Sequence, residues 1–226
     1  MISQKNKKIH IIGTNAKDID DCTLEAMEKI DCSDLIIIPK VFENAFFIHA
    51  KNNKIKIIEQ ESLSKQNNRF LWKKIFNLFD SQNKVISHLL DGDTYIDNKG
   101  LVEKKYFDNC GIECEVIPGI IKFVNIINKN SELLTDREKN SSVTFIKIYG
   151  LKEVEKILKN SFFEKVAVFI ESKEQFIIIK KYLKNYQSIK NFKIKYIDAN
   201  SEKINKLSIN NQNMLINPSY IIIEKK

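Results

Sequence analysis

The stretch KVISHLLDGDTYIDNKG, residues 84–100, decides the fold class. Residues 84–90 are largely apolar and predict a short strand that stops at the loop DGDT. In an open α/β sheet, ligands bind at the carboxyl ends of the strands. Gly92 would let the backbone approach a ligand closely, and the Asp93 carboxylate could accept hydrogen bonds from hydroxyl or amine groups. An ordinary surface turn is the simpler interpretation of the same loop.

The succession of a strand, a polar loop and a helix repeats through the first half of the chain. Strands are predicted over residues 8–12 and 35–38, and the second is a continuous apolar run, as in strands buried on both faces of a parallel sheet. Strands alternating with helices predict a parallel or mostly parallel sheet. Asp18, Lys40 and Asp93 follow three of these strands, so we expect them on one edge of the sheet.

The second half predicts another α/β unit with its own strands. These strands are expected over residues 142–149, 165–170, 192–197 and 220–224, with helices over 151–159 and 174–186 and a polar stretch over 200–213. We therefore expect an α/β protein of two domains, residues 1–118 and 119–226. A cleft between two such domains is a common place for a small-molecule site, so we expect the active site there.

The composition is that of a soluble globular protein. The chain has 226 residues, 43% hydrophobic and 29% charged, with a net charge of +8. This charge suggests an acidic partner, such as a nucleic acid, a membrane surface or a small polyanion. A lysine-rich solvated surface explains it more simply, because lysine is frequent throughout. No RRM, OB or helix-turn-helix signature supports nucleic-acid binding.

Cysteines and histidines predict neither a metal site nor a disulfide framework. The four cysteines form no CxxC pair, and the three histidines lie far from them in sequence. The apolar run near the N-terminus is too short for a signal peptide, and no run reaches the roughly 18 residues of a membrane span. We therefore expect a cytoplasmic protein with free thiols, no metal and no membrane partner. GxGxxG, GxxxxGK[ST] and HExxH motifs are absent from the sequence.

Four stretches, in the same order along the chain, resemble the tetrapyrrole (corrin/porphyrin) methylase family. GTNAKDIDDCTLEAM (13–27) is similar to the family's GxGPGDxxLLTLxAL, and DLIIIPK (34–40) also resembles the family. DGDTYIDNKG (91–100), followed by GIECEVIPGI (111–120), is similar to GGDPFIFGRG and GIPFEVVPGI. LTDREKNSSVTFI (134–146) is similar to LTHRxxxxSVTFV and points to the uroporphyrinogen-III C-methyltransferase branch. DLIIIPK is equally similar to the precorrin-2 methyltransferase branch.

The sequence departs from the family pattern at loops that the resemblance places next to the cofactor. Most of the replacements introduce a charged or polar residue. The departures are Asn15 and Lys17 for glycine, Asp91 for glycine, Thr94 for proline, Ile121 and Lys122 for Thr-Ser or Thr-Ala, and Glu171 for methionine.

The resemblance implies an S-adenosyl-L-methionine-dependent enzyme whose site residues fall at the matched positions. The residues implied to bind the cofactor are Gly92, Asp93, Ile96, Pro118 and Gly119. Asp18 is implied as the general base and Lys40 as the proton donor. A polycarboxylate tetrapyrrole substrate would meet basic side chains, for which the candidates are Lys17, Lys40, Lys99, Lys122 and Arg137. The resemblance also implies a homodimer.

Three functions remain open at this point. The first is C-methylation of uroporphyrinogen III to precorrin-2, for sirohaem or cobalamin biosynthesis. The second is another precorrin methyltransferase, such as one acting at C20 of precorrin-2. The third is a catalytically silent member of the family that binds a tetrapyrrole or a protein partner.

Overall fold

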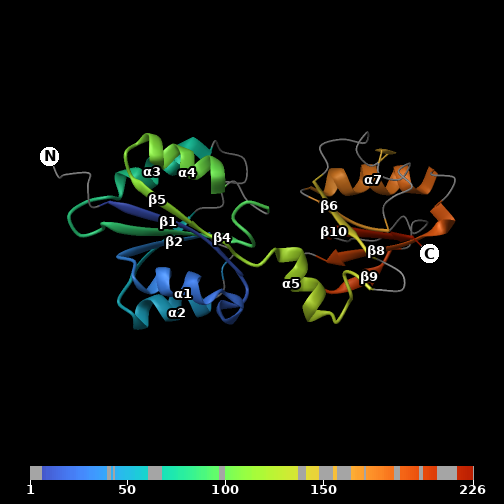
Figure 1. The fold of residues 1–226 in the computed structure, drawn as a ribbon, viewed down its shortest axis with the longest axis horizontal. Coiled ribbons are helices and arrows are strands. Elements are labelled where there is room, and N and C mark those ends of the chain that lie inside the picture. The colour runs from blue at the N-terminus through green and yellow to red at the C-terminus, as the bar shows by residue number, and fades with distance from the viewer. Residues whose placement is uncertain are drawn as a thin grey trace. The chain divides into compact units, whose positions relative to one another are not determined.

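The computed structural model of the protein contains two compact units, Met1–Lys122 and Phe123–Lys226, each with its own sheet (Figure 1). The structure describes residues 7–39, 42, 44–60, 68–96, 100–136, 141–147, 155–156, 164–170, 172–185, 189–198, 201–207 and 218–225. The helix predicted over 151–159 falls almost entirely outside these residues. Both units mix helices and strands, so the predicted α/β class is confirmed.

The first unit is a five-stranded parallel sheet in the order β3-β2-β4-β1-β5. Its strands are β1 (Lys8–Thr14), β2 (Leu35–Pro39), β3 (Lys56–Gln60), β4 (Val85–Asp91) and β5 (Glu113–Ile117). One face is covered by α1 (Leu24–Asp31) and α2 (Asn44–Asn52), and the other by α3 (Asn68–Asn77) and α4 (Gly100–Asn109) (Figure 1). The prediction of a parallel sheet is thus confirmed.

Strands β1 and β4 lie side by side at the centre of this sheet and end level with one another. Thr14 of β1 is in register with Asp91 of β4. The chain leaves β1 for α1 on one face and leaves β4 for α4 on the other, so the two loops diverge. A ligand crevice forms at such a switch point in open α/β sheets.

Three glycines bring the loops after β1, β4 and β5 into backbone contact. Gly92 has φ of 87°, a conformation that favours glycine, and its N–H donates to the Thr14 carbonyl at 2.7 Å. A Cβ on Gly13 would lie 2.5 Å from the Gly119 nitrogen and 2.7 Å from the Gly92 oxygen. A Cβ on Gly119 would press on Gly92 and lie 2.7 Å from the Gly13 carbonyl carbon. Side chains are therefore excluded at this junction, which we call the glycine junction.

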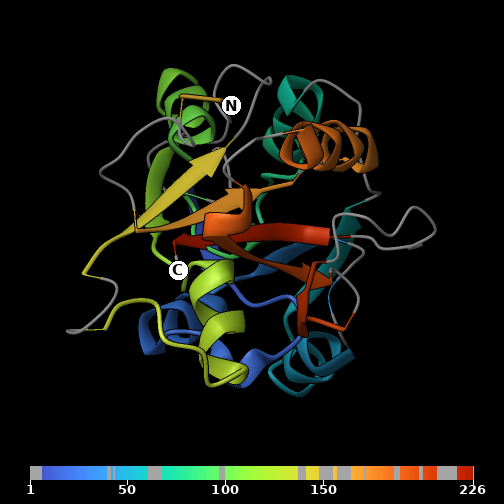
Figure 2. The same cartoon turned by 90° about the vertical axis from the view of Figure 1, so that its right-hand side faces the viewer.

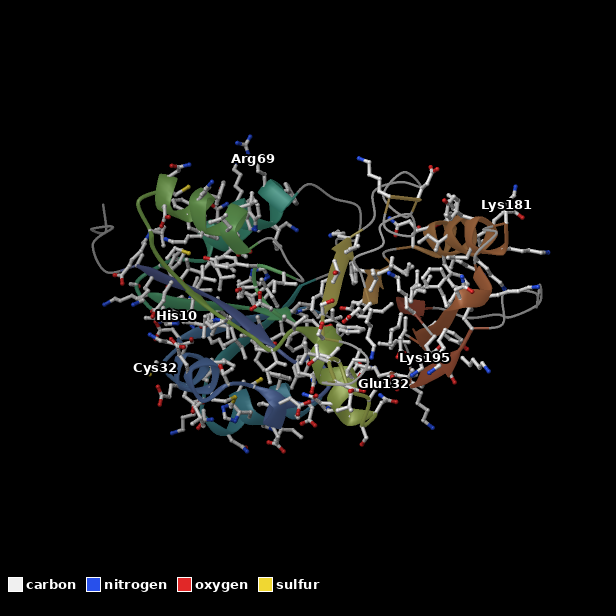
Figure 3. All side chains as sticks on the ribbon, turned by 45° about the vertical axis from the view of Figure 1, so that its right-hand side comes forward. His10, Cys32, Arg69, Glu132, Lys181 and Lys195 are labelled. Carbon is white, nitrogen blue, oxygen red and sulfur yellow. The ribbon has the colours of Figure 1, made fainter. Side chains whose placement is uncertain are left out.

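A polar chain runs through the core between the first sheet and α1. His10 of β1 is only 3% exposed, and its Nδ1 lies 3.3 Å from Ser87 Oγ on β4 (Figure 3). Its Nε2 lies 3.6 Å from a carboxylate oxygen of Glu115 on β5, and the same oxygen accepts a hydrogen bond from Lys29 Nζ at 2.9 Å. Burial lowers the pKa of His10, and the Glu115 carboxylate opposes this shift only in part.

The second unit is a mixed five-stranded sheet in the order β6-β7-β10-β8-β9. β6 and β7 pair in parallel and the remaining pairs are antiparallel. The strands are β6 (Val143–Lys147), β7 (Lys165–Phe169), β8 (Phe192–Asp198), β9 (Ile204–Lys206) and β10 (Pro218–Lys225). The sequence predicted four of them; β9 lies within the polar stretch 200–213, where no strand was predicted.

Two helices cover opposite faces of the second sheet (Figures 1 and 2). α7 (Lys173–Asn185) packs Phe176, Ile179 and Leu183 onto one face. α5 (Lys122–Lys129) begins with Phe123, whose ring lies 5.3 Å from Phe145 and 5.1 Å from Tyr220 on the other face. The period of the apolar residues in both helices explains why each buries a single stripe.

We predict that His10 stays neutral in the folded protein at pH values where an exposed histidine is protonated. Its folded-state pKa is lowered, so the unfolded chain takes up a proton first as the pH falls through about 6.5. The stability that depends on a neutral His10 is therefore full above that pH and lost below it. An NMR titration of the histidine ring resonances, with His10 assigned from the His10→Gln spectrum, measures this pKa. A midpoint at or above the ordinary value would contradict the prediction.

Gly119→Ala should lower the free energy of unfolding by about 1–3 kcal/mol, the usual cost of adding a methyl group where there is no space. The new Cβ would meet the backbone of Gly92 and Gly13 and not a side chain that can move aside. Urea denaturation monitored by circular dichroism measures the change. Ile120→Ala, at the neighbouring residue that is 40% exposed, is the control and should change stability far less. Equal stability of Gly119→Ala and the wild type would show that the junction has room for a side chain.

Candidate functional site

The candidate site lies at the carboxyl ends of β1, β4 and β5, around the glycine junction. Asp91, the last residue of β4, joins the three loops through its carboxylate. Its Oδ1 accepts a hydrogen bond from Ala16 N at 3.0 Å, and its Oδ2 accepts one from Lys122 Nζ at 2.6 Å. The Asp91 and Lys122 side chains are 23% and 30% exposed. An ion pair therefore occupies the strand ends where the family pattern has small residues.

Sequence reasoning did not assign Asp91 to the site and assigned Lys122 only to substrate carboxylates. Their pairing was nevertheless signalled, because both depart from the family pattern and their charges are opposite. Asp91 and Lys122 are 31 residues apart, so only the fold brings them together. A substrate carboxylate that binds Lys122 must compete with the carboxylate of Asp91.

The loop after β4 is built on the carboxylate of Asp93. Its Oδ1 accepts hydrogen bonds from Tyr95 N at 2.8 Å and Ile96 N at 2.9 Å, the pattern of an Asx turn. This oxygen therefore makes the turn that the simpler interpretation expected. The Tyr95 and Ile96 side chains are left 54% and 57% exposed. The loop thus displays two apolar side chains beside a half-buried carboxylate, and the cofactor roles of Gly92, Asp93 and Ile96 stay predictions.

Buried contacts hold both ends of this loop. Thr94 is 1% exposed, and its carbonyl accepts a hydrogen bond from Gly100 N at 2.9 Å. His88 of β4 and Glu103 of α4 lie 2.7 Å apart, from Nδ1 to Oε1, with side chains 2% and 4% exposed. Removing one partner of such a pair leaves a polar group buried without its bond, which is costly. The pair therefore links the strand before the loop to the helix after it.

The loop after β1 is organised by capping interactions. Asp18 Oδ1 accepts a hydrogen bond from Asp20 N at 3.1 Å and caps the short 3-10 helix η2 (Ile19–Asp21). Asn15 Oδ1 accepts from Lys17 N at 3.1 Å, and its Nδ2 donates to Asp21 Oδ2 at 2.5 Å. Asp18 therefore has the helix-terminal role that competes with catalysis in the sequence argument, and its role as a base stays a prediction.

The structure brings together only some of the predicted site residues. Gly92 and Gly119 meet at the glycine junction, and Pro118 is exposed beside them. Lys40, the predicted proton donor, lies outside the described residues. So do three other positions singled out in the sequence, Lys99, Arg137 and Glu171.

The described residues also limit other kinds of chemistry. Among them, no group of three or more His, Cys, Asp and Glu side chains is placed to hold a metal ion. Burial raises the pKa of Cys114 to about 12, so its thiol stays protonated near neutral pH. No described helix is long and apolar enough to cross a bilayer.

Curated proteins with similar sequences are tetrapyrrole enzymes. The chain is 26% identical over 156 residues to the uroporphyrinogen-III C-methyltransferase of Bacillus subtilis (strain 168), and the aligned region covers 65% of this chain and 57% of that protein. It is 27% identical over 154 residues to the siroheme synthase of Blochmanniella pennsylvanica (strain BPEN), and this aligned region covers 64% of this chain and 31% of that protein. The matches thus span less than two thirds of these relatives. No family model matches the chain.

Solved structures with this fold include tetrapyrrole methyltransferases and diphthine synthases. The uroporphyrin-III-C-methyltransferase of Thermus thermophilus superposes with a TM-score of 0.70 at 14% identity, over 97% of this chain and 93% of that one. The cobalt precorrin-4 methyltransferase gives a TM-score of 0.72 at 14% identity, over 100% of this chain and 97% of that one. With the matching motifs in their order along the sequence, these likenesses support the resemblance to the tetrapyrrole methylase family, from which the chain diverges.

Proposed function

We propose that the protein is an S-adenosyl-L-methionine-dependent C-methyltransferase that acts on a tetrapyrrole, with uroporphyrinogen III as the substrate and precorrin-2 as the product. The position of the Asp93 loop carries this proposal. The loop follows β4 at the switch point of the sheet, where it joins the glycine junction. The curated relative from Bacillus subtilis has this activity by name, which supports the same substrate here. We propose a cytoplasmic homodimer on the strength of the resemblance.

The residues of the Asp93 loop fit the cofactor. The half-buried Asp93 carboxylate suits the amine or the ribose hydroxyls, and the exposed Tyr95 and Ile96 side chains suit an adenine ring. The Thermus thermophilus enzyme with the same fold was solved with S-adenyl homocysteine, which supports this choice. When bound, S-adenosyl-L-methionine supplies an electrophilic methyl group on sulfur.

The chain's own residues would position the reactants and move protons. The bound cofactor would supply its methyl group to a pyrrole carbon of the substrate and would leave as a neutral thioether. Holding the carbon, methyl and sulfur in line is largely a matter of orientation, which rigid loops provide. The ring gains positive charge in this step, and Asp18 is proposed to accept the proton that the ring system then loses. Lys40 is proposed as the proton donor.

A binding protein without catalysis is the second candidate. The Asp91–Lys122 ion pair favours it, because this pair places the protein's own charges where the family pattern has small residues. A different precorrin as the substrate is a variant of the first candidate. Both alternatives are separated from the main proposal by the two experiments below.

Titration calorimetry with S-adenosylhomocysteine should give a micromolar Kd for the wild type. Asp93→Ala should weaken binding by about tenfold or more, because it removes both the charge and the acceptor of two loop N–H groups. Asp93→Asn keeps an acceptor oxygen and isolates the contribution of the charge. Asp108→Asn, a charge removed from the exposed face of α4, is the control and should bind like the wild type. Absence of binding up to millimolar ligand would exclude the methyltransferase.

Asp18→Asn should leave S-adenosylhomocysteine binding intact and slow methyl transfer to uroporphyrinogen III by roughly 100-fold, a usual contribution of a general base. Asparagine still offers an oxygen to Asp20 N, so the cap of η2 is retained while the basic group is lost. Mass spectrometry of the tetrapyrrole product measures the reaction. Unchanged turnover in Asp18→Asn would remove Asp18 from the catalytic role. Cofactor binding without methylation of uroporphyrinogen III or of precorrin-2 in the wild type would favour the second candidate, and methylation of precorrin-2 alone would favour the different substrate.

A further inference from the structure

A groove of about 300 Å³ lies in the second unit, on the sheet face that carries α5. Its floor is formed by β8 and β9, and its wall by the turn that follows α5. Its lining contains three lysines and one acidic residue, and the contributing residues are Asn130, Glu132, Lys193, Ile194, Lys195, Ile204, Asn205 and Lys206. All of these residues belong to the second unit, whereas the glycine junction belongs to the first, and the proposed methyl transfer uses none of them.

The wall of the groove is fixed by Asn130. Its Nδ2 donates to the carbonyls of Ile126 at 2.8 Å and Glu202 at 2.9 Å, and its Oδ1 accepts from Ile204 N at 3.2 Å. One side chain therefore ties the end of α5 to both ends of the turn before β9. The hydrogen bond from Leu207 N to Ile194 O, at 2.9 Å, closes β9 onto β8. A groove held in this way is preorganised, which lowers the entropic cost of binding.

Strand register gathers three lysines on the floor. Lys193 and Lys195 are two residues apart on β8, so they point to the same face. Lys195 is directly opposite Lys206 of β9 in the antiparallel register. Like charges in directly opposed positions destabilise a strand pair, unless a group of opposite charge lies between them.

The acidic residues nearby only partly balance these lysines. Glu132, in the turn that follows α5, forms an ion pair with Lys195, and both residues are labelled in Figure 3. Glu224 of β10 is in register with Lys193, but it is equally in register with the buried Lys165 on its other side. Within the described part of the chain, neither Lys193 nor Lys206 forms a side-chain ion pair, and both are exposed.

We infer that this groove binds a small polyanion with at least two anionic groups, either phosphates or carboxylates. One group would bind Lys193, two residues from Lys195 along β8, and the other would bind Lys206, opposite Lys195 on β9. The ligand would supply the negative charge that the register of β8 and β9 lacks. Ammonium groups with freely rotating donors bind either kind of oxyanion, so the site fits a class of ligand defined by its charge.

The test is calorimetric titration of the full chain with inorganic pyrophosphate and, separately, with citrate, at about 0.15 M ionic strength to screen long-range attraction. Lys193→Gln/Lys206→Gln should weaken the binding of the preferred probe by about tenfold or more, through the loss of two charged hydrogen bonds. Lys181→Gln/Lys184→Gln is the matched control, because it removes the same charge from exposed positions on α7. It should bind like the wild type.

The two probes distinguish the source of the anionic groups. Preference for pyrophosphate would assign the site to a phosphorylated ligand, and preference for citrate to a polycarboxylate. Equal weakening in both double variants would show that binding depends only on the net charge of the protein, and this would overturn the inference. The absence of saturable binding by either probe would overturn it as well. S-adenosylhomocysteine binding should be unchanged in Lys193→Gln/Lys206→Gln, so this result does not depend on the outcome for the proposed function.

Discussion

The contact of three backbone segments at Gly13, Gly92 and Gly119 is the constraint on which the first unit depends. The chain segments at the ends of β1, β4 and β5 can converge because Gly13 and Gly119 have no Cβ and because Gly92 adopts a φ of 87°. Their convergence places the end of β4 against the start of the loop after β1, and it sets where the Asp91 carboxylate reaches Ala16 N. The position of the candidate site is therefore a consequence of close backbone packing.

Polar pairs buried on both faces of the first sheet reinforce this arrangement. His10 and Ser87 lie beneath α1, and His88 and Glu103 lie beneath α4. Ser87 and His88 are neighbours on β4, and their side chains form hydrogen bonds on opposite faces of the sheet. Because buried polar groups need their partners, such pairs specify one alignment of strands and helices, whereas apolar contacts tolerate small shifts. The strands that carry the site are therefore fixed from above and from below.

Much of the fold could be predicted from the sequence because buried parallel strands are apolar runs that end at turn residues. Residues 35–38 and 84–90 are examples, and both became strands of the first sheet. β9 could not be predicted in this way. Only three residues long, with Asn205 and Lys206 in it, it shows no clear alternation and is held by its register with β8 and by Asn130.

The candidate site was predictable in its location but not in its contacts. Glycines at strand ends indicated the edge of the sheet, and a carboxylate after Gly92 indicated a turn or a ligand. That Asp93 Oδ1 is used by two loop N–H groups, or that the three glycines touch, depends on the spatial arrangement of distant segments. Local sequence carries no such information.

The Asp91–Lys122 ion pair couples the effects of substitutions at these two positions. Each residue departs from the family pattern, and each neutralises the charge of the other at the strand ends. Glycine at position 91 would remove the carboxylate that Lys122 binds, and a small residue at position 122 would remove the ammonium group that Asp91 binds. Any single replacement toward the common pattern therefore breaks this ion pair, and only a simultaneous exchange of both residues avoids a sequence that keeps one half of it.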